Sequence, residues 1–372
     1  MKRVQEKYIL EDLREKYVFL AGPRQSGKTT LSKQLYHPSL YQYLNYDRPE
    51  DRQIMIQGHW SRERGLVILD EFHKFPKWKS FLKGIYDTEG NRPNILMTGS
   101  AKLNIFRRGN DSMVGRYYYH RLLPLAVGEL KQDLKPEEAV KHLLSYGNFP
   151  EPFLKSSLRH RKRWQQQYLE RVTREDITDL SNVRQIPKIQ LLVDMLRQRV
   201  GSNISYASLA RDLEIAPKTA KEWIDLLEQL YIVFRVTPYY HNIARSLLKE
   251  PKIYFFDCTM AFNQESHLEN LVAVSLLKHL WFMEDNEGIT GRLHYLRTKD
   301  GKEIDFVTVQ DSQIMDLIEV KTGEDQLHSA FYYFSKWIKP KGSYQLVLNL
   351  RQPKTVEGIS IQSVAEYLSQ LN

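Results

Sequence analysis

The chain has 372 residues, a length that exceeds one ordinary compact domain and predicts two to four domains. Its composition, with 42% hydrophobic, 12% aromatic and 27% charged residues, is typical of a globular protein, and no apolar run approaches the ~18 residues needed to span a bilayer. The 54 Lys and Arg against 45 Asp and Glu give a net charge of +9, which permits ATP or nucleic acid as a partner and equally fits an ordinary basic surface.

The amino-terminal segment and the cysteine content favour a cytoplasmic protein. Residues 1–17 are charged throughout and lack the apolar segment of a secretory signal. Cys258 is the single cysteine, which excludes an internal disulfide framework and fits a reducing compartment. We therefore expect a cytoplasmic location and no membrane partner.

Four parts follow one another along the chain and predict an α/β fold. Residues 1–130 alternate short apolar strands with helices, which predicts a parallel sheet covered by helices. Residues 131–200 predict a helical linker or lid, residues 201–250 a winged-helix-like module, and residues 251–372 a further mixed α/β domain. The helical part has candidate core positions at helical spacing, namely Leu143, Trp164, Tyr168, Val172, Leu192 and Leu196.

The segment GPRQSGKT, residues 22–29, matches the phosphate-binding pattern G-x-x-x-x-G-K-[ST] without a mismatch. The two glycines permit a backbone that aims successive N–H groups at phosphate oxygens, the lysine can reach the β- and γ-phosphates, and the threonine hydroxyl can ligate Mg²⁺. An apolar strand precedes the segment and a helix can begin within it, which favours a bound anion. The sequence therefore predicts a P-loop NTPase domain with ATP and Mg²⁺ as cofactors, bound by Gly22, Pro23, Arg24, Gln25, Ser26, Gly27, Lys28, Thr29 and Thr30.

A buried strand, Leu66 to Leu69, ends in the two acids Asp70 and Glu71. Ligands of open α/β sheets bind at the carboxyl ends of strands, so Asp70 is expected to hold Mg²⁺ and Glu71 to polarise the attacking water. An acidic strand end that faces solvent is the alternative, but the phosphate loop some forty residues earlier favours the catalytic interpretation.

Polar and basic residues after the next strand complete the predicted ATP site. The strand NILMTGS ends in Ser100, which is expected to orient the attacking water between the loop and the acids. Arg116 is a candidate arginine finger acting in a neighbouring subunit, with Arg107 and Arg108 as rivals. For any one of these arginines, a solvated salt bridge is the more common role.

By these motifs the chain resembles the prokaryotic AAA+-superfamily ATPases that join an ATPase domain to a C-terminal domain of undefined function. The blocks that carry the resemblance are GPRQSGKTTL, VILDEFHKFPKW, ILMTGSAKL and GRYYYHRLLPLAVGEL, followed by REDITDL, PKIYFFD, LENLVAVSLLKHL, KEIDFV and LIEVKTG. Ser26 stands where valine is common, and Phe72-His73 replace a more usual Ile-Gln; neither change affects a phosphate or metal ligand. The resemblance implies an oligomer, since such relatives often assemble into rings.

Two segments of the middle region are candidates for DNA contact. Residues 205–236 have the rhythm of a helix-turn-helix whose second helix would present Lys218, Thr219 and Lys221 to a groove, although the acids Asp225 and Glu228 on that helix oppose phosphate binding. A structural module that packs against protein is the alternative. Upstream lie four basic residues that either form a solvated face or follow a phosphate backbone, namely Arg159, Arg161, Lys162 and Arg163.

The last part resembles a restriction-endonuclease-like core, with an acid-bearing helix, three strands, a helix and a fourth strand. Glu319 and Lys321 share one face of a strand, and a hairpin would bring Asp305 beside Glu319. Asp305 and Glu319 are expected to bind Mg²⁺, Lys321 to orient the nucleophile, and Glu269 to complete the metal shell. A salt-bridged group that holds the end of the sheet is the alternative.

The sequence thus predicts a Mg²⁺-dependent ATPase whose cycle is coupled to DNA binding or remodelling by the C-terminal half. Two other interpretations stay open. One is a nucleotide-driven switch that recruits proteins through an inactive nuclease-like platform, and the other is an ATP-gated DNA nuclease.

Overall fold

The computed structural model describes residues 2–99, 113–177, 185–239, 250–298, 300–323 and 326–372. By its internal contacts the chain divides into two compact units, Met1–Leu123 and Pro124–Asn372, which we call unit 1 and unit 2. Within the described ranges, no helix is both long enough and apolar enough to cross a bilayer. The finer division of the chain into four parts remains a prediction.

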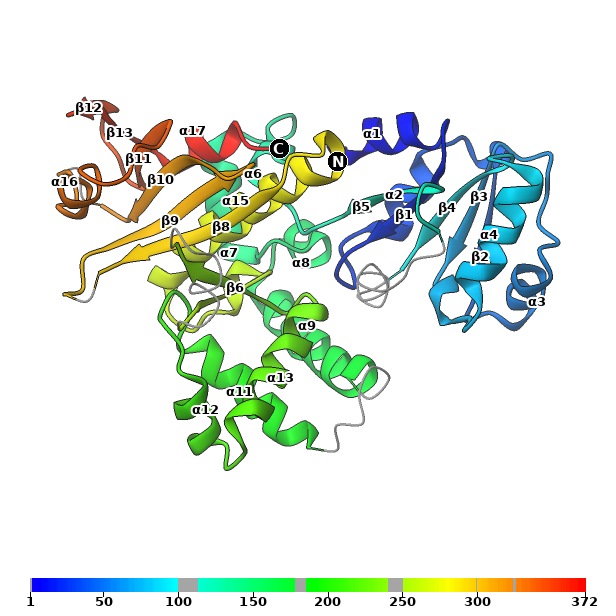
Figure 1. Cartoon of the computed structure of the whole chain (residues 1–372), viewed down its shortest axis with the longest axis horizontal. Coiled ribbons are helices and arrows are strands. Elements are labelled where there is room, and N and C mark those ends of the chain that lie inside the picture. The colour runs from blue at the N-terminus through cyan, green and yellow to red at the C-terminus, as the bar shows by residue number, and fades with distance from the viewer. Residues whose placement is uncertain (1, 100–112, 178–184, 240–249, 299, 324–325) are drawn as a thin grey trace. The chain divides into compact units, whose positions relative to one another are not determined.

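Unit 1 is built on a five-stranded sheet in which every neighbouring pair is parallel (Figure 1). The strand order is β2-β3-β4-β1-β5, so β4 separates the strand before the phosphate loop from the strand that ends in Asp70. The predicted parallel sheet is confirmed, with β5 as an additional edge strand. The strands are β1 (Tyr17–Ala21), β2 (Tyr41–Asn45), β3 (Leu66–Asp70), β4 (Asn94–Thr98) and β5 (Tyr117–Arg121).

Both faces of this sheet are covered because successive residues of a strand point to opposite faces. Val18 and Leu20 belong to one core, which also contains Ile9 and Leu31 from α1 and α2. Phe19 belongs to the other core, with residues from α3 and α4. The helices of unit 1 are α1 (Gln5–Asp12), α2 (Lys28–Gln34), α3 (Pro49–Gln57) and α4 (Trp78–Glu89), with short 3₁₀ turns at Pro38–Leu40 and Phe72–Lys74.

Unit 2 begins with a helical region, in which the six predicted core residues are all buried. The predicted helix-turn-helix pair is also present as α12 and α13, and the Ser205 side chain caps α12 by accepting a hydrogen bond from the Ser208 N–H. The helices are α6 (Val127–Leu130), α7 (Pro136–Tyr146), α8 (Pro150–Lys155), α9 (Leu158–Arg171), a π-helical turn (Val172–Asp176), α11 (Ile186–Arg197), α12 (Tyr206–Asp212) and α13 (Pro217–Gln229).

The rest of unit 2 is organised by an eight-stranded mixed sheet of order β12-β13-β11-β10-β9-β8-β6-β7. The strand YIVFRV, which follows the second helix and was expected to begin a wing, contains the start of β6, and β6 pairs with β7 and β8 at one edge of this sheet. The strands are β6 (Val233–Pro238), β7 (Lys252–Phe255), β8 (Gly291–Arg297), β9 (Glu303–Gln310), β10 (Gln313–Lys321), β11 (Gly342–Val347), β12 (Lys354–Val356) and β13 (Ile359–Ser363).

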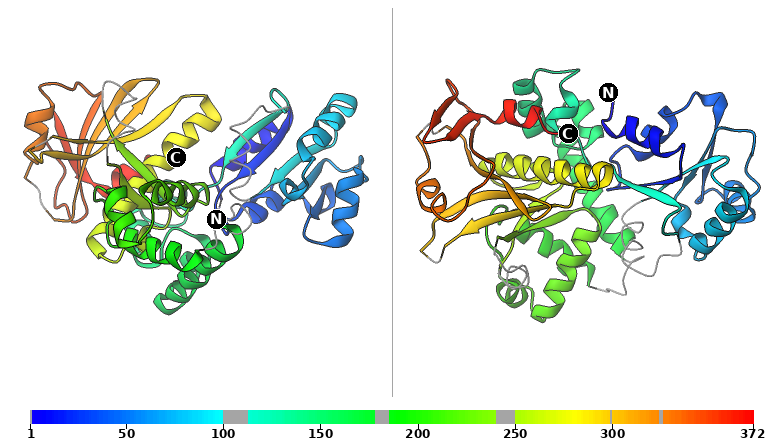
Figure 2. Two further views of the ribbon diagram at one scale, coloured as in Figure 1. Left: turned by 60° about the horizontal axis from the view of Figure 1, so that its bottom comes forward. Right: turned by 45° about the horizontal axis from the view of Figure 1, so that its top comes forward.

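Helices cover both faces of this second sheet. The long helix α15 (Gln264–Glu287) crosses one face and packs on β7, β8, β9 and β10 (Figure 2). On the other face, Phe331 and Phe334 of α16 (Ala330–Phe334) pack with Val307 of β9 and Leu317 of β10. The chain ends with α17 (Val364–Ser369), which packs on α6 and α7. This arrangement places α15 beside the strands that carry the predicted acid and lysine residues.

Candidate functional site

The phosphate loop follows β1 and leads directly into α2. At Gly22 the loop lies so close to the backbone after β5 that a Cβ there would approach the Leu122 carbonyl oxygen to 2.3 Å. Gly27 has φ 95° and caps the amino end of α2, a left-handed conformation that costs glycine little. Gln25 also has a positive φ, of 61°. Such turns direct backbone N–H groups toward an anion, as the motif predicts.

Lys28 and Thr29 lie at the first turn of α2. The Lys28 ammonium is buried and donates to the carbonyl oxygens of Gly22 and Pro23, at 3.0 Å and 2.6 Å. The Thr29 hydroxyl donates to Asp70 Oδ2 at 3.1 Å. The loop and the predicted acidic strand end are therefore brought together, because the carboxyl ends of parallel strands lie at the same end of the sheet.

Asp70 is the centre of the polar contacts at this edge of the sheet. Besides Thr29, its carboxylate accepts hydrogen bonds from the Tyr43 hydroxyl at 2.6 Å and from the Thr98 hydroxyl. Burial and the adjacent Asp70 raise the pKa of Tyr43 well above its usual value. These neighbours fix the orientation of the Asp70 carboxylate. The polar strand end that carries Thr98 was expected near the acids, whereas no motif marks Tyr43.

Glu71 leaves the strand in a strained backbone conformation, with φ 59°. Its N–H donates to the Thr98 carbonyl oxygen at 3.0 Å, and its carboxylate lies 3.5 Å from Lys74 Nζ. Burial raises the pKa of Glu71, and the charge of Lys74 opposes that shift. A carboxylate with a raised pKa next to the phosphate loop has the basicity that a general base needs.

The donor set of unit 1 fits Mg²⁺ with a bound nucleotide. A hydroxyl and a carboxylate, from Thr29 and Asp70, are hard oxygen ligands of the kind that Mg²⁺ takes, and they already lie within hydrogen-bond distance of each other. Ser26 Oγ in the phosphate loop is buried without a hydrogen-bond partner among the described residues, so the loop has unused polar capacity. When bound, Mg²⁺ would neutralise charge on the phosphates.

The predicted finger lies at the amino-terminal end of the parallel strands, whereas the phosphate loop lies at their carboxyl end. Arg116 immediately precedes β5, and its guanidinium pairs with Asp87 through contacts of 2.6 Å and 3.1 Å. Because β1 and β5 are parallel and in register, about five residues or ~16 Å of strand separate Arg116 from the loop. Its side chain therefore does not reach the phosphate loop of its own unit. Ser100, Arg107 and Arg108 lie outside the described residues.

One residue near the loop escaped sequence analysis altogether. Arg3 is buried and donates to the carbonyl oxygens of Ser26, at 3.0 Å, and of Leu123. It therefore joins the phosphate loop to the last residue of unit 1. No motif marks this arginine, because its partners lie 23 and 120 residues away in the chain.

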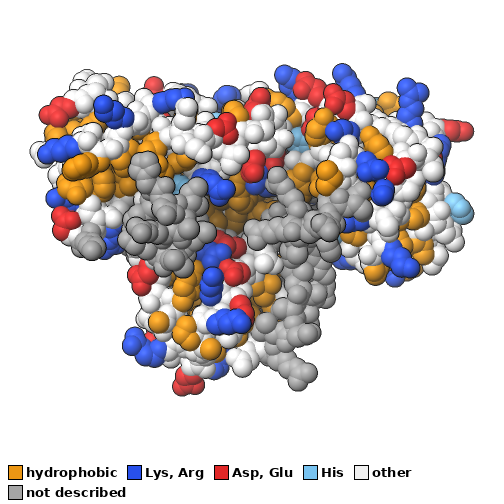
Figure 3. Space-filling model, in the orientation of Figure 1, with side chains coloured by type: hydrophobic (Ala, Val, Ile, Leu, Met, Phe, Trp, Pro, Cys, Tyr) orange, Lys and Arg blue, Asp and Glu red, His pale blue; other side chains and the backbone are white. Residues whose placement is uncertain are grey.

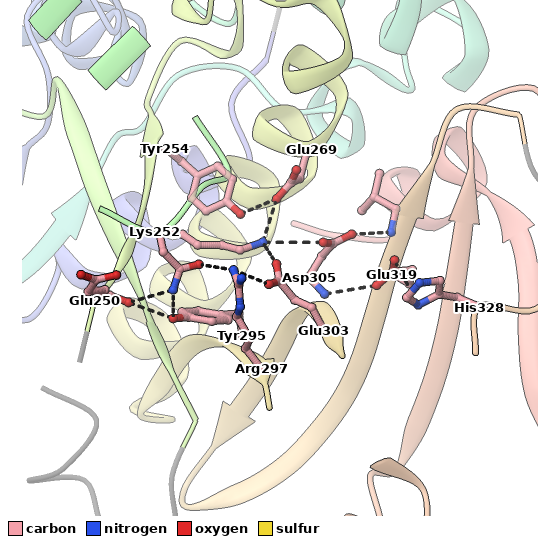
Figure 4. Close-up of polar contacts among 12 residues, drawn as sticks. Glu250, Lys252, Tyr254, Glu269, Tyr295, Arg297, Glu303, Asp305, Glu319 and His328 are labelled. Carbon is pink, nitrogen blue, oxygen red and sulfur yellow. Dashed lines mark hydrogen bonds and ion pairs between the residues drawn. The ribbon is translucent and has the colours of Figure 1, made fainter. Parts of the chain in front are cut away.

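In unit 2, the predicted acid and base residues do lie together (Figure 4). Strands β9 and β10 are antiparallel, and the Asp305 N–H donates to Glu319 Oε2 at 3.3 Å while Asp305 Oδ2 accepts from the Val320 N–H at 2.9 Å. Lys321 Nζ lies 2.8 Å from Glu319 Oε1, and His328 Nδ1 lies 3.3 Å from the same oxygen. The alternation of residues along β10 thus places Glu319 and Lys321 as expected.

A lysine that the sequence analysis did not consider lies among these acids. Lys252 of β7 has a side chain only 2% exposed, and its Nζ lies 2.5 Å from Glu303 and 3.3 Å from Glu269. Burial alone would lower the pKa of Lys252, but the charges of Glu269, Asp305 and Glu303 raise it above its usual value. Burial also raises the pKa of Glu269, and the charge of Asp305 adds to that shift.

The predicted metal ligands of unit 2 do not fit a divalent ion in this arrangement. Both carboxylate oxygens of Asp305 and both of Glu319 already accept a hydrogen bond or face a cation. Across the described ranges, no group of three or more His, Cys, Asp or Glu side chains is arranged to hold a metal ion. The structure brings the four predicted side chains together as members of an ion-pair network, namely Glu269, Asp305, Glu319 and Lys321.

The two candidate DNA-contacting helices differ in their charge environment. On α13, Lys218 is exposed but lies 3.9 Å from Glu222, while Asp225 pairs with Arg235 of β6 at 2.6 Å. On α9, Arg161 donates to the Ser145 carbonyl oxygen, whereas three other basic residues are exposed at spacings of three and four and share one helix face, namely Arg159, Lys162 and Arg163. Three of the four basic residues therefore share one exposed face of α9. Figure 3 shows Lys and Arg side chains of unit 2 interspersed with Asp and Glu on the face it draws.

Comparison with protein families assigns three segments of the chain. Residues 14–131 match the family described as AAA domain, residues 137–266 a domain of unknown function (DUF8612), and residues 264–367 another domain of unknown function (DUF4143). Together with the parallel sheet and the phosphate loop, the first match shows that unit 1 contains a segment similar to the AAA domain family. The two matches in unit 2 assign it no activity.

Relatives of similar sequence occur in bacteria and archaea. The chain is 27% identical over 242 residues to uncharacterized proteins of Mycobacterium tuberculosis and Mycobacterium bovis, which covers 64% of this chain and 54% of each relative. It is 26% identical over 307 residues to an uncharacterized protein of Methanocaldococcus jannaschii, covering 68% of this chain and 63% of that protein. This chain spans about half the length of the mycobacterial relatives.

Several solved structures overlap with more than half of the chain. A Walker-type ATPase of Pyrococcus abyssi covers 71% of this chain and 95% of its own, with a TM-score of 0.43 and 16% sequence identity. A likeness at that level carries no conclusion about activity.

Proposed function

We propose that unit 1 binds and hydrolyses ATP with Mg²⁺. The observation that carries this proposal is the contact between the Thr29 hydroxyl and Asp70, 3.1 Å apart beside a complete phosphate loop. Lys28 and the loop N–H groups would bind the phosphates, Thr29 and Asp70 would hold the metal, and Glu71 would accept the proton of the attacking water. In this proposal, the Tyr43 and Thr98 hydroxyls keep the Asp70 carboxylate in position.

Steady-state ATP hydrolysis by the Lys28→Ala and Glu71→Gln variants tests this proposal. Lys28→Ala should lose both nucleotide binding and turnover, whereas Glu71→Gln should keep binding and lose turnover, because only the proton acceptor is removed. Lys7→Ala on α1 is the control, because its exposed side chain pairs with Glu11 away from the phosphate loop, and it should hydrolyse ATP normally. Wild-type turnover by Lys28→Ala would refute the assignment.

We further propose that ATP turnover is coupled to DNA binding by unit 2, through a winged-helix-like pair and a restriction-endonuclease-like sheet. The support comes from α9, where Arg159, Lys162 and Arg163 share an exposed face. Basic side chains that contact the phosphate backbone of DNA bind without sequence preference, and their affinity falls steeply as the salt concentration rises. Asp225 and Glu228 of α13 are acidic and pair with Arg235 of β6, so α13 is the weaker candidate for contact with DNA.

The coupling is tested by measuring ATP hydrolysis with and without single-stranded, duplex and branched DNA. Stimulation by one form, lost in the Arg159→Glu/Lys162→Glu variant, would support the coupling. If no DNA form changes the rate of ATP hydrolysis and the affinity for DNA does not depend on salt concentration, a nucleotide-driven switch that recruits proteins would be favoured. Metal-dependent nicking of DNA, lost in Asp305→Asn, would instead favour an ATP-gated nuclease.

A homo-oligomer in which Arg116 completes a neighbour's ATP site is also proposed, since Arg116 cannot reach the loop of its own unit. Mixing the Lys28→Ala and Arg116→Ala variants tests it. If the arginine acts in trans, mixed oligomers contain intact sites and turnover reappears. If each variant stays inactive after mixing and subunit exchange, the trans role is excluded.

A further inference from the structure

The acids of unit 2 surround a buried ammonium group (Figure 4). Lys252 Nζ lies 2.5 Å from Glu303 Oε1, 3.3 Å from Glu269 Oε1 and 3.7 Å from Asp305 Oδ1. The carboxylates come from α15 and β9, while the lysine comes from β7. One side-chain cation therefore connects three elements at the place where the nuclease-like pattern predicts a divalent metal.

The remaining oxygens of the predicted metal pair are also engaged. Asp305 Oδ2 accepts from the Val320 N–H, Glu319 Oε2 accepts from the Asp305 N–H, and Glu319 Oε1 lies 2.8 Å from Lys321 Nζ. Glu269 Oε1 in addition accepts from the Tyr254 hydroxyl at 2.6 Å. A divalent ion could coordinate these residues only by displacing several contacts at once.

The charges around Lys252 also argue against a bound divalent ion. The ammonium groups of Lys252 and Lys321 lie among four acids, namely Glu269, Glu303, Asp305 and Glu319. Arg297 Nη1 lies 3.1 Å from Glu303 Oε2. Because the Lys252 ammonium is covalently attached and almost fully buried, it cannot leave to make room for another cation. Adding a divalent ion beside it would bring like charges together in a site shielded from water.

We propose that Lys252 is the resident cation of this site, and that unit 2 uses its nuclease-like arrangement as a metal-free binding scaffold. The lysine does structurally what a metal would do, because it neutralises the acids and ties α15 to β7 and β9. This inference deepens the proposed function of unit 2, since a scaffold of this kind would bind DNA without cutting it. The cation assignment itself does not require ATP turnover or DNA binding.

Mn²⁺ binding to the nucleotide-free full-length chain, followed by electron paramagnetic resonance of the free ion, tests the assignment. Wild type and Asp305→Asn should bind Mn²⁺ identically, because neither has an open site in unit 2. Lys252→Met keeps the chain length of lysine but removes its charge, and it should gain one Mn²⁺ site with a dissociation constant at least about tenfold lower than any site of wild type. The double variant Lys252→Met/Asp305→Asn should lose that site again.

Lys321→Met is the matched control, since it removes a lysine paired with the same group of acids but leaves Lys252 in place. It should gain no Mn²⁺ site. Mn²⁺ should also raise the unfolding temperature of Lys252→Met and leave that of wild type unchanged. A Mn²⁺ site in wild type that Asp305→Asn abolishes would overturn the assignment, even if Lys252→Met failed to fold. A folded Lys252→Met that gains no site would overturn it too.

DNA binding is measured on the same wild-type preparation in the presence of a chelator. Binding without divalent metal supports the scaffold role. If DNA does not bind but the Mn²⁺ results are as expected, the proposed DNA function of unit 2 fails while the assignment of Lys252 stands. Metal-dependent nicking by wild type that is lost in Asp305→Asn overturns the scaffold role.

Discussion

At the scale of single residues, the phosphate loop depends on close backbone contacts as much as on its charged groups. Gly22 approaches the Leu122 carbonyl so closely that no side chain fits, and Arg3 holds the Ser26 and Leu123 carbonyl oxygens from a position outside the motif. Both residues act on the shape of the loop without any role in the chemistry. Their substitution should therefore affect nucleotide binding through geometry.

Gly22→Ala should abolish nucleotide binding, because the added Cβ would meet the Leu122 carbonyl oxygen at 2.3 Å and force the loop apart. Gly84→Ala is the control within unit 1. Gly84 lies inside α4 with open space around its Cα, so alanine there should stabilise the protein by about 0.5–1 kcal/mol. Titration with a fluorescent ATP analogue and urea unfolding measure the two effects. Wild-type affinity in Gly22→Ala would show that the loop tolerates the shift.

Arg3→Gln should weaken nucleotide binding roughly tenfold, because the buried Ser26 carbonyl oxygen of the loop loses its donor and the low end of the usual cost of about 1–3 kcal/mol corresponds to that factor. Arg3→Lys keeps the charge but cannot donate to both carbonyl oxygens in the same geometry, so its affinity should be intermediate. A purely structural role would lower the unfolding temperature of both variants without changing ATP affinity in the folded protein. Calorimetric titration below the unfolding transition separates the two cases.

The predictable residues of the ATP site are those within short, spaced motifs. Lys28, Thr29 and Asp70 could be found because the chemistry of phosphate and Mg²⁺ demands these residue types at the carboxyl ends of strands in one parallel sheet. Arg3 and Lys252 could not be found, because their partners are distant in sequence and a lone lysine before an apolar strand has many ordinary roles. Only the folded arrangement shows that Lys252 is enclosed by acids.

At the scale of elements, the two-residue alternation of strands was sufficient to predict which side chains meet. It placed Glu319 and Lys321 on one face of β10 and Asp305 beside Glu319 in the antiparallel pair with β9. Which sheet β6 joins could not be predicted, because strand alternation gives no information on it. Its pairing with β8 depends on contacts between Thr237 and His294, 57 residues apart.

Glu319→Gln should flatten the pH dependence of unit 2 stability. Burial raises the pKa of Glu319 above its unfolded value of 4.5, and the charge of Asp305 adds to that shift. The folded state therefore binds more protons than the unfolded state, so the free energy of unfolding falls as pH rises from 4.5 to the raised folded pKa. Glutamine removes this titration, and urea unfolding between roughly pH 5 and 9 measures the slope.

The control for this slope is Glu366→Gln on α17, an exposed acid that should leave the pH dependence unchanged. An unchanged slope in Glu319→Gln would mean that Glu319 does not titrate differently in the folded and unfolded states. A slope that Glu269→Gln removes instead would show that Glu269 of α15, not Glu319, is the acid that titrates.

At the scale of the whole molecule, the chain consists of unit 1, which is similar to an AAA domain, and a larger unit 2 that contains the ion-pair network around Lys252. Each unit has its own sheet, and within each the helices cover both faces of that sheet. Nucleotide contacts are confined to the phosphate loop edge of unit 1 in the proposed function. Changes in the Lys252 network should therefore affect the stability of one unit and spare nucleotide binding by the other.

Because each unit has its own sheet and core, Lys252→Met should destabilise unit 2 and leave nucleotide binding by unit 1 unchanged. Removing the ammonium leaves buried carboxylates without their counter-charge, at a cost of about 3–5 kcal/mol, so the unit 2 transition should fall by about 10 °C in a calorimetric scan. ADP at about 100 times its dissociation constant should stabilise unit 1 by about 2.7 kcal/mol in wild type and variant alike. Lower pH should restore part of the lost stability, since protonation discharges the unpaired acids. If the variant lost ADP stabilisation, or if both transitions moved together, the two units would have to fold as one cooperative body.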